Sequence, residues 1–545
     1  MPHSTSPLIL QSSGWGGNDG NWSTYQLNVG TPPQGFSVLP STTSSEIWVP
    51  VPEGCNASIA GCASSRGVQS FNGVQSSGFQ FNESSSWKQI GIYGLSGYDD
   101  LFPDSGDAAL YGLDNISLNS PANTSTFGSQ IVGGISSYNF WLGMFGLGIQ
   151  PGTFSNLPNN ATTLLESAKE IGLSPAASYG FYAGAAYRKS DNTERSSAPG
   201  SVVLGGYDQA AFEPSNITFP TIFAGARSLT VRLKSLVVTN TPQGAVSPMI
   251  DTSGLNVSID STVAQIWLPG TICDVLSDAL GLHYDNGTEL YFVNATMHET
   301  LLNYAPEFTF MIAAPSMINK TTAIVLPYAA FDQQIGQPWS TTNTTYFPIR
   351  RAANDTQLVL GRTFLQEAYL IVDWERQNFT LGQSLHRPGV SSDIVAIHPV
   401  SSRKDKSSEV TAGATSGIVI GVVLLALLVF GGGYFLRRHS RRRRQQDEAS
   451  RTHIAELDGK AESPVGVELM SNNVHEMSSP PAMAEKEASF GGKLELEGCD
   501  GAHLVENGEI YELPGHDVGH EMDSAIAKIS AERGAADVDE KASTR

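Results

Sequence analysis

The stretch FSVLPSTTSSEIWVP, Phe36 to Pro50, has a counterpart later in the chain, NVSIDSTVAQIWLP, Asn256 to Pro269. Apolar residues, hydroxyl residues, an Ile-Trp pair and a final proline recur in the same order in both stretches. Coincidence seldom matches four features that include a rare tryptophan, so the repeat indicates an internal duplication. We therefore expect two similar lobes of roughly 180 residues each, within the usual size of a domain.

The sequence around this repeat has the pattern of an all-β protein. Val, Ile, Thr, Tyr and Phe alternate with polar residues, and Gly, Pro or Asn-Gly turns interrupt them about every eight to twelve residues. Helical spacing of apolar residues is sparse and clearest in Thr162 to Leu173 and Thr271 to Leu282. The expected fold is all-β, with one lobe at residues 22–220 and a second at residues 221–395.

Composition excludes several classes of function. The 545 residues are 40% hydrophobic, which is ample for a sizeable core. The net charge of -21 argues against nucleic acid as a partner, because no basic face is present to release counterions from phosphates. No metal-ligand spacing, phosphate loop or dinucleotide fingerprint appears, so we expect neither a metal nor a cofactor.

The later part of the chain predicts a membrane anchor. Ala414 to Leu436 carry no charge and are long enough to cross a bilayer as a helix. RRHSRRRR, Arg437 to Arg444, follows directly and marks the cytosolic side by the positive-inside rule. We therefore expect a lumenal or extracellular N-terminal part, a stalk at 396–413 and a single-pass span at 414–436 in the plasma membrane or endomembrane system. Residues 437–545, which have an acidic excess beyond Arg444, should form a disordered cytosolic tail.

Small residues recur on one face at the start of this span. Gly413, Gly417 and Gly421 are four apart, which would let a second helix approach closely. A homodimer through these glycines is a further expectation.

Glycosylation sequons agree with an exported N-terminal part. Fourteen Asn-x-Ser/Thr sites all precede the span, and the Ser-rich tail has none. They are Asn21, Asn56, Asn82, Asn115, Asn123, Asn160, Asn216, Asn256, Asn286, Asn294, Asn319, Asn343, Asn354 and Asn378. MPHSTSPLIL lacks the basic and apolar regions of a signal peptide. Either the start of the reading is truncated or the span itself directs export of the long N-terminal part, and we favour truncation.

Two cysteines fit an oxidising compartment. Cys55 and Cys62 are close enough for a small disulfide loop, which leaves Cys273 without an obvious partner.

Several segments resemble the pepsin-like aspartic peptidases and follow one another in that family's order. They are YQLNVGTPPQGFSV (Tyr25 to Val38), GIYGLSGYDD (Gly91 to Asp100), FWLGMFGLG (Phe140 to Gly148), GSVVLGGYD (Gly200 to Asp208) and QLVLGRTFLQEAYLIVDWERQNFTLG (Gln357 to Gly382). The resemblance implies a bilobal β fold with a peptide-binding cleft between the lobes. It also implies that Cys55 and Cys62 form the family's first disulfide loop and that Tyr93 is the tyrosine of the flap over the cleft.

The resemblance further implies a pair of catalytic aspartates, one from an Asp-Thr/Ser-Gly loop in each lobe. The two carboxylates share a proton, one activating water while the other hydrogen-bonds the scissile carbonyl. In the second lobe the motif is IDST, so Asp260 is the retained aspartate and Ser261 braces its loop. In the first lobe Ser41 stands at the aspartate position, and Thr42 is the bracing residue.

Two further substitutions weaken the site. Thr43 and Thr262 replace the glycines that end the family's two loop motifs. Shifting the register does not help the first loop, because no aspartate lies between Asp19 and Asp99. Asp251, in MIDTSG, is an alternative for the second loop, but the Ile-Trp-Leu-Pro continuation follows Asp260 and favours it.

These residues leave three functional hypotheses. The first is a membrane-anchored pepsin-like protein that is catalytically impaired and binds a peptide or protein ligand in its cleft. The second is an active aspartic endopeptidase with an atypical site that uses Asp260. The third is a surface receptor or structural protein with a vestigial cleft. The serine at position 41 favours the first hypothesis over the second.

Overall fold

The computed structural model describes residues 6–400 apart from 57, 96–97, 99–100, 103–106, 120–123, 151, 153, 156–160, 189–194, 216, 223–226, 250–252, 316 and 387–389. All described residues belong to one compact unit, residues 1–418, and a second unit, residues 419–545, contains none of them. The predicted span, the predicted tail, most of the stalk, Asp251, Asn123, Asn160 and Asn216 therefore lie outside the described residues, as does the side chain of Asn319.

The fold is mostly β, with few helices. In the described residues one sheet has fourteen strands. Along its path they are β14 (Phe212–Glu213), β29 (Asn378–Ser384), β28 (Ala368–Asp373), β11 (Ser178–Arg188), β12 (Arg195–Leu204), β1 (Leu8–Gly16), β2 (Trp22–Val29), β3 (Gln34–Ser41), β10 (Gly143–Gly146), β4 (Ile47–Pro50), β9 (Thr124–Ile135), β8 (Ala108–Asn119) and β7 (Lys88–Gly94), and β15 (Thr218–Pro220) pairs with β29.

The second half of the chain contributes a separate eight-stranded sheet. Its strands are β23 (Met317–Pro327), β22 (Glu307–Ala314), β16 (Thr230–Thr241), β18 (Leu255–Ile259), β27 (Val359–Leu360), β19 (Ile266–Pro269) and β26 (Ile349–Ala352), with β17 (Gly244–Val246) paired to β16. A four-stranded sheet holds β20 (His283–Asp285), β21 (Leu290–Phe292), β25 (Thr344–Phe347) and β24 (Gln333–Ile335). Two pairs complete the described strands: β5 (Ser70–Phe71) with β6 (Val74–Gln75), and β13 (Gly206–Asp208) with β30 (Ile394–Ala396).

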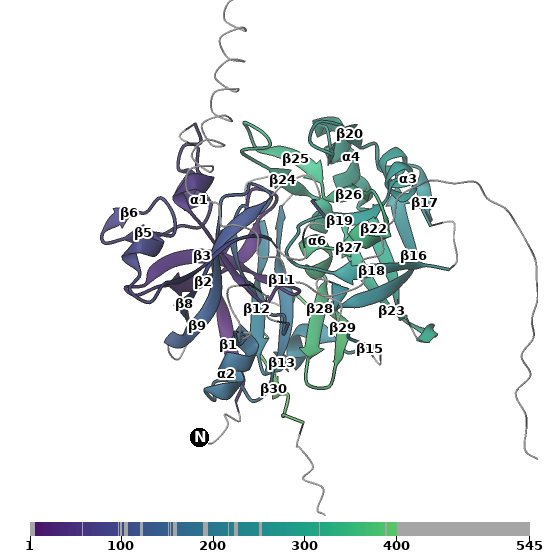
Figure 1. The fold of residues 1–545 in the computed structure, drawn as a ribbon. Coiled ribbons are helices and arrows are strands. Elements are labelled where there is room, and N and C mark those ends of the chain that lie inside the picture. The colour runs from purple at the N-terminus through teal and green to yellow at the C-terminus, as the bar shows by residue number, and fades with distance from the viewer. Residues whose placement is uncertain are drawn as a thin grey trace, which may run out of the picture. The chain divides into compact units, whose positions relative to one another are not determined.

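The two halves of the chain meet in a shared group of strands. β11 pairs antiparallel with β28 from Ser178↔Asp373 to Phe181↔Leu370, which joins strands from the first half to the final hairpin. In Figure 1 the purple strand β3 of the first half and the teal strands β16 and β18 of the second half lie on opposite sides of β11 and β28. The joined sheet gives each lobe a fixed base from which its loop can reach the other.

Helices are short, and local signals explain their ends. The described helices are α1 (Cys62–Ser65), α2 (Leu164–Glu170), α3 (Gly270–Leu280), α4 (Ala295–Tyr304), α5 (Tyr328–Phe331) and α6 (Arg362–Leu365). α2 begins with a capping box between Thr163 and Glu166, and α3 ends at Gly281, whose φ of 62° suits glycine. These two helices lie where the apolar spacing predicts them. α4, capped by Asn294, was not predicted.

Buried apolar side chains form two main groups. The larger runs through both lobes and includes Leu27, Phe145, Leu233 and Phe364. The second includes Trp48 and Trp267, the tryptophans of the two duplicated stretches. No helix in the described part of the chain is long and apolar enough to span a bilayer.

Candidate active site

The two duplicated stretches form the same strand-loop-strand unit, one in each lobe. β10 lies parallel to β3 and antiparallel to β4, and β27 lies parallel to β18 and antiparallel to β19. β3 ends at Ser41, and β18 ends directly before Asp260. We call residues 41–43 the first loop and residues 260–262 the second loop.

A glycine beside each loop allows this close support. A Cβ on Gly146 would collide with the carbonyl of Ser44, and a Cβ on Gly361 would collide with the carbonyl of Gln265. Only glycine, which has no side chain, fits at either position, because the backbone of the adjoining segment lies directly against it. The apolar-glycine segments of the sequence therefore act as the supports of the two loops.

The second residue of each loop binds the other loop. The Thr42 amide donates to Ser261 Oγ at 2.9 Å, and the Ser261 amide donates to Thr42 Oγ1 at 3.0 Å. Each hydroxyl then donates to the carbonyl that precedes the opposite loop: Ser261 to Pro40 at 2.7 Å and Thr42 to Ile259 at 3.4 Å. This reciprocal exchange aligns the two loops about a local twofold axis and sets Ser41 at the position that corresponds to Asp260.

The third residue of each loop also reaches across, through a side chain that glycine would lack. Thr43 Oγ1 donates to Asp260 Oδ1 at 2.9 Å, and Thr262 Oγ1 lies 2.7 Å from Ser41 Oγ. The Thr262 amide donates to Asp260 Oδ1 at 2.8 Å. Two threonine hydroxyls therefore lie between the loops and use hydrogen-bonding capacity of Ser41 and Asp260.

Tyr98 also takes part in this hydrogen-bond network, through its hydroxyl. Its hydroxyl lies 3.0 Å from Thr43 Oγ1 and 2.5 Å from Thr262 Oγ1, so it touches one loop of each lobe. Its ring makes edge contacts with Trp48 and Phe140, with centroids 5.2 and 5.3 Å away. A buried tyrosine side chain thus fills the space over the two loops.

A second aromatic side chain bridges the lobes beside Tyr98. The Phe102 ring lies 5.8 Å from Phe140 in the first lobe and 5.6 Å from Trp267 in the second. The cavity between Phe102 and Thr262 measures about 40 Å³, which is room for a few water molecules and not for a peptide. Tyr98 and Phe102 therefore each contact residues of both lobes beside the two loops.

Burial governs the electrostatics of the site. The exposed fraction is 0% for Ser41 and 2% for Asp260. Burial raises the pKa of Asp260 from its ordinary value of 3.8, although the hydrogen bonds from Thr262 and Thr43 and the charge of Arg362 act in the opposite direction. Burial and the nearby Asp260 charge also raise the pKa of Tyr98 far above its ordinary value, so Tyr98 is a neutral donor.

The raised pKa of Asp260 predicts a pH-dependent stability effect. A carboxyl whose pKa is raised by folding favours the folded state at acid pH, and this contribution is lost as pH rises through the folded pKa. Asp260→Asn removes the titration, so its unfolding free energy relative to wild type should increase as pH rises from about 4 to 7. Urea unfolding followed by tryptophan fluorescence would measure this free energy. All eight tryptophans precede residue 375, so the signal reports on the two lobes.

Asp285 gives the matched control for this experiment. Hydrogen bonds from Thr288 lower the pKa of Asp285, so that carboxylate loses its stabilising effect as pH falls. Asp285→Asn should therefore differ from wild type by a nearly constant unfolding free energy between about pH 4 and 7, because the stability that a lowered carboxyl pKa provides is lost only below the ordinary pKa of 3.8. Parallel trends in the two variants would contradict the assignment.

The sequence that forms this arrangement matches the model of a known protein family. The family model described as eukaryotic aspartyl protease matches residues 24–384. The chain belongs to the eukaryotic aspartyl protease family. Secreted aspartic protease 8 of Candida albicans is 23% identical over 367 residues, which cover 67% of this chain and 76% of that protein. Secreted aspartic protease 1 of Candida albicans is 24% identical over 363 residues, 66% of this chain and 80% of that protein.

A yeast relative is similar to the same extent. Aspartic proteinase yapsin-3 of Saccharomyces cerevisiae is 23% identical over 396 residues, covering 68% of each chain. The resemblance to pepsin-like peptidases that the sequence motifs indicate is thereby confirmed for this aspartyl protease family member.

An ion pair fixes the second loop of this family member. Arg362 donates to the carbonyls of Ser261 and Thr262 at 2.9 and 2.8 Å and pairs with Asp19 at 2.9 Å. Its guanidinium also lies 4.9 Å from the centroid of the Trp22 ring. No local pattern in the sequence links residues 19 and 362, so sequence reasoning missed this support.

The structure places the predicted flap tyrosine away from the two loops. Tyr93 lies on β7, packs against Phe154 at 5.0 Å and has its hydroxyl 2.9 Å from Ser155 Oγ. Tyr98, five residues later in the same quoted segment, makes the contacts with the loops instead. Only the tertiary contacts of the two tyrosines show which of them lies against the loops. The role of Tyr93 stays a prediction.

The predicted disulfide is present between Cys55 and Cys62. Cys273 is a free, buried thiol, and burial raises its pKa to about 12, which disfavours the thiolate form. Ten sequon asparagines have described side chains, and none of them is buried. They are Asn21, Asn56, Asn82, Asn115, Asn256, Asn286, Asn294, Asn343, Asn354 and Asn378.

Proposed function

We propose that this protein is a catalytically impaired pepsin-like protein that binds a peptide or protein ligand between its lobes. The observation that carries the proposal is the Ser41 hydroxyl, which occupies the position corresponding to Asp260 and lies 2.7 Å from Thr262 Oγ1. A serine hydroxyl does not ionise in the working range of a carboxyl, so Ser41 and Asp260 cannot share a proton as two carboxylates do.

The same geometry limits the catalysis of peptide hydrolysis that Asp260 could provide without a second carboxylate. Oδ1 of Asp260 already accepts from the Thr262 amide and the Thr43 hydroxyl, which hold it as an acceptor within the net. Activation of water by a positioned base is worth about 10²- to 10⁴-fold in rate, and protonation of the leaving group needs a second group. An active endopeptidase that uses Asp260 is the second candidate, because a buried carboxyl with a raised pKa is suited to acid-base chemistry.

We place the protein at a membrane, with its pepsin-like part outside the cytosol. The charge-free segment 414–436, the arginines after it and the sequon asparagines, none of whose described side chains is buried, support this location. The names of two similar proteins from Candida albicans, which describe them as secreted, are consistent with it. Pairing through Gly413, Gly417 and Gly421 remains part of this proposal.

We expect a ligand that reaches the two loops to displace Tyr98, because its hydroxyl contacts Thr43 in one loop and Thr262 in the other. Tyr98→Ala should therefore increase affinity for members of a degenerate peptide library by about tenfold, because the ligand no longer displaces a packed ring. Tyr98→Phe is the matched control, since it keeps the ring and should leave affinity within about twofold of wild type. Equilibrium binding to the full-length protein, read by mass spectrometry, measures both.

Three results would be informative. Tighter binding by Tyr98→Ala supports a cleft that accepts peptides. Equal binding by all three proteins would contradict occupation of the cleft by Tyr98. If Tyr98→Ala is folded and binds no peptide, the cleft is vestigial and the receptor or structural hypothesis replaces the proposal.

A further inference from the structure

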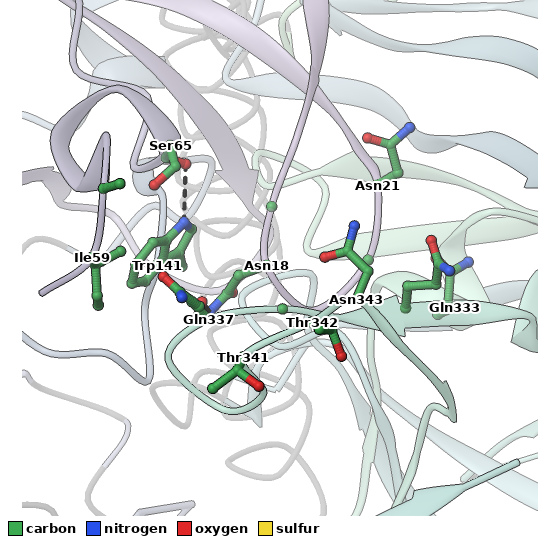
Figure 2. A pocket seen from close by; sticks show the side chains of 15 residues that line it. Asn18, Asn21, Ile59, Ser65, Trp141, Gln333, Gln337, Thr341, Thr342 and Asn343 are labelled. Carbon is green, nitrogen blue, oxygen red and sulfur yellow. Dashed lines mark hydrogen bonds between the residues drawn. The ribbon is translucent and has the colours of Figure 1, made fainter. Parts of the chain in front are cut away.

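A polar pocket lies apart from the two loops. It measures about 410 Å³, within the roughly 300 to 1,000 Å³ of typical ligand pockets. Four parts of the chain line it: residues 17–18 with 20–21, three residues between Ile59 and Ser65, Trp141, and residues from Gln333 to Asn343. Figure 2 shows Asn18, Gln337, Thr342 and Asn343 gathered around the space, with Trp141 at one wall. We call it the amide pocket.

The lining of the amide pocket is polar and uncharged. It contains no Asp, Glu, Lys, Arg or His, and its amide side chains are Asn18, Asn21, Gln333, Gln334, Gln337 and Asn343. Each amide offers donors and an acceptor together, which suits ligand hydroxyls that also donate and accept. A charged ligand would find no opposite charge there, and an apolar ligand would leave the amides without partners.

One wall of the pocket is a fixed indole. The Trp141 Nε1 donates to the Ser65 carbonyl at 2.9 Å, and the Arg66 guanidinium lies 5.4 Å from the Trp141 ring. Arg66 is itself fully buried and donates to the Trp141 carbonyl at 3.0 Å. An aromatic wall beside amides and hydroxyls provides an apolar contact for the C–H face of a ligand whose edges are polar.

Hydrogen bonds connect the second-lobe wall of the pocket to the first-lobe wall in the absence of a ligand. The Gly336 amide donates to the Asn18 carbonyl at 2.7 Å, and Asn18 Nδ2 donates to the Gln337 carbonyl at 3.2 Å. Tyr346 Oη donates to the Asp19 carbonyl. Walls held in this way lose little conformational freedom on binding, which favours affinity.

Two sequon asparagines line this same pocket. Asn21 begins Asn-Trp-Ser, and Asn343 begins Asn-Thr-Thr. A glycan attached to either asparagine would present its first sugars to the pocket at high effective concentration. We propose that the amide pocket is a binding site for a neutral oligosaccharide, supplied either by the chain's own N-glycan or by a separate glycan. This inference does not depend on whether the protein cleaves or binds peptides.

The test uses the full-length protein from a secretory host. Asn21→Gln with Asn343→Gln removes both sequons and keeps an amide at each position. Binding of N,N′-diacetylchitobiose and mannobiose is followed by calorimetry, and mass spectrometry reports glycan occupancy at the two asparagines in wild type. Single variants are prepared alongside the double variant, so that a folding failure in one protein leaves the others to report.

We expect the double variant to bind at least one neutral disaccharide. If wild type carries a glycan at Asn21 or Asn343 and binds at least tenfold more weakly, the chain's own glycan fills the pocket. If both asparagines are unmodified and wild type binds equally well, the glycan comes from outside. Both results support the proposal and distinguish its sources.

Wall variants test whether the sugar is in this pocket. Adding Gln334→Met and Thr342→Val to the double variant should weaken disaccharide binding by at least tenfold, because both changes remove hydrogen-bonding groups at nearly constant volume. Gln89→Met, an exposed glutamine on β7 outside the pocket, should leave affinity unchanged. Absence of sugar binding in every folded variant, or affinity that the wall changes do not alter, overturns the proposal. Binding of neutral peptides in place of sugars would assign the pocket to another ligand class.

Discussion

Changing Ser41→Asp together with Thr43→Gly and Thr262→Gly should raise peptide hydrolysis by about 10²- to 10⁴-fold over wild type, the usual worth of positioned acid-base groups. The first change restores the second carboxylate. The two glycines remove the hydroxyls that now hydrogen-bond Asp260 and Ser41. kcat/KM on a degenerate peptide library between pH 3 and 7 measures the gain.

Ser41→Asp alone should gain less than about tenfold, because Thr43 and Thr262 still occupy the space between the loops. The control is Asp260→Asn added to the triple variant, which should return hydrolysis to the wild-type level. If Ser41→Asp alone gives the full gain, the threonines do not obstruct the site. If the triple variant folds and stays inactive, substitutions outside the loops have also removed the activity.

The second large effect concerns stability and comes from Arg66. This side chain is 0% exposed and donates to carbonyls from Gly54, Ser136, Ser137, Phe140 and Trp141. Arg66→Met would leave these buried acceptors without a donor, so we expect unfolding free energy to fall by about 3 to 5 kcal/mol. Urea unfolding followed by tryptophan fluorescence measures the loss.

Arg376 provides the comparison for Arg66. Its side chain is 42% exposed and pairs with Asp373 three residues away. Arg376→Met should cost about 0 to 1 kcal/mol, as exposed ion pairs usually do. Similar losses in the two variants would show that the carbonyl cluster around Arg66 contributes little.

Local patterns in the sequence predict the framework of the site. The repeated Ile-Trp-x-Pro stretches correspond to β4 and β19, and the apolar-glycine segments correspond to β10 and β27, which lie beside them. Alternation of apolar and polar residues predicts strands because it reflects the two faces of a sheet. The aspartate and serine positions follow from this framework, because each loop directly continues a recognisable strand.

The contents of the site could not be predicted in the same way. Thr43 and Asp260 are 217 residues apart, and Tyr98 and Thr262 are 164 apart, so no local periodicity reports their contacts. The sequence shows that two glycines are replaced by threonines, but only the fold shows that both hydroxyls reach the opposite loop. The amide pocket could not be predicted for the same reason, since its walls come from four segments that are distant in the sequence.

The most direct test of the impaired site compares wild type with Asp260→Asn as full-length proteins. Both are incubated with a degenerate peptide library from pH 3 to 7, and products are counted by mass spectrometry. The geometry around Ser41 predicts equal product levels at every pH, because the single carboxylate supplies no catalysis that asparagine removes. Hydrolysis by wild type that exceeds Asp260→Asn by about 10²-fold or more would contradict this and establish a peptidase that works with one aspartate.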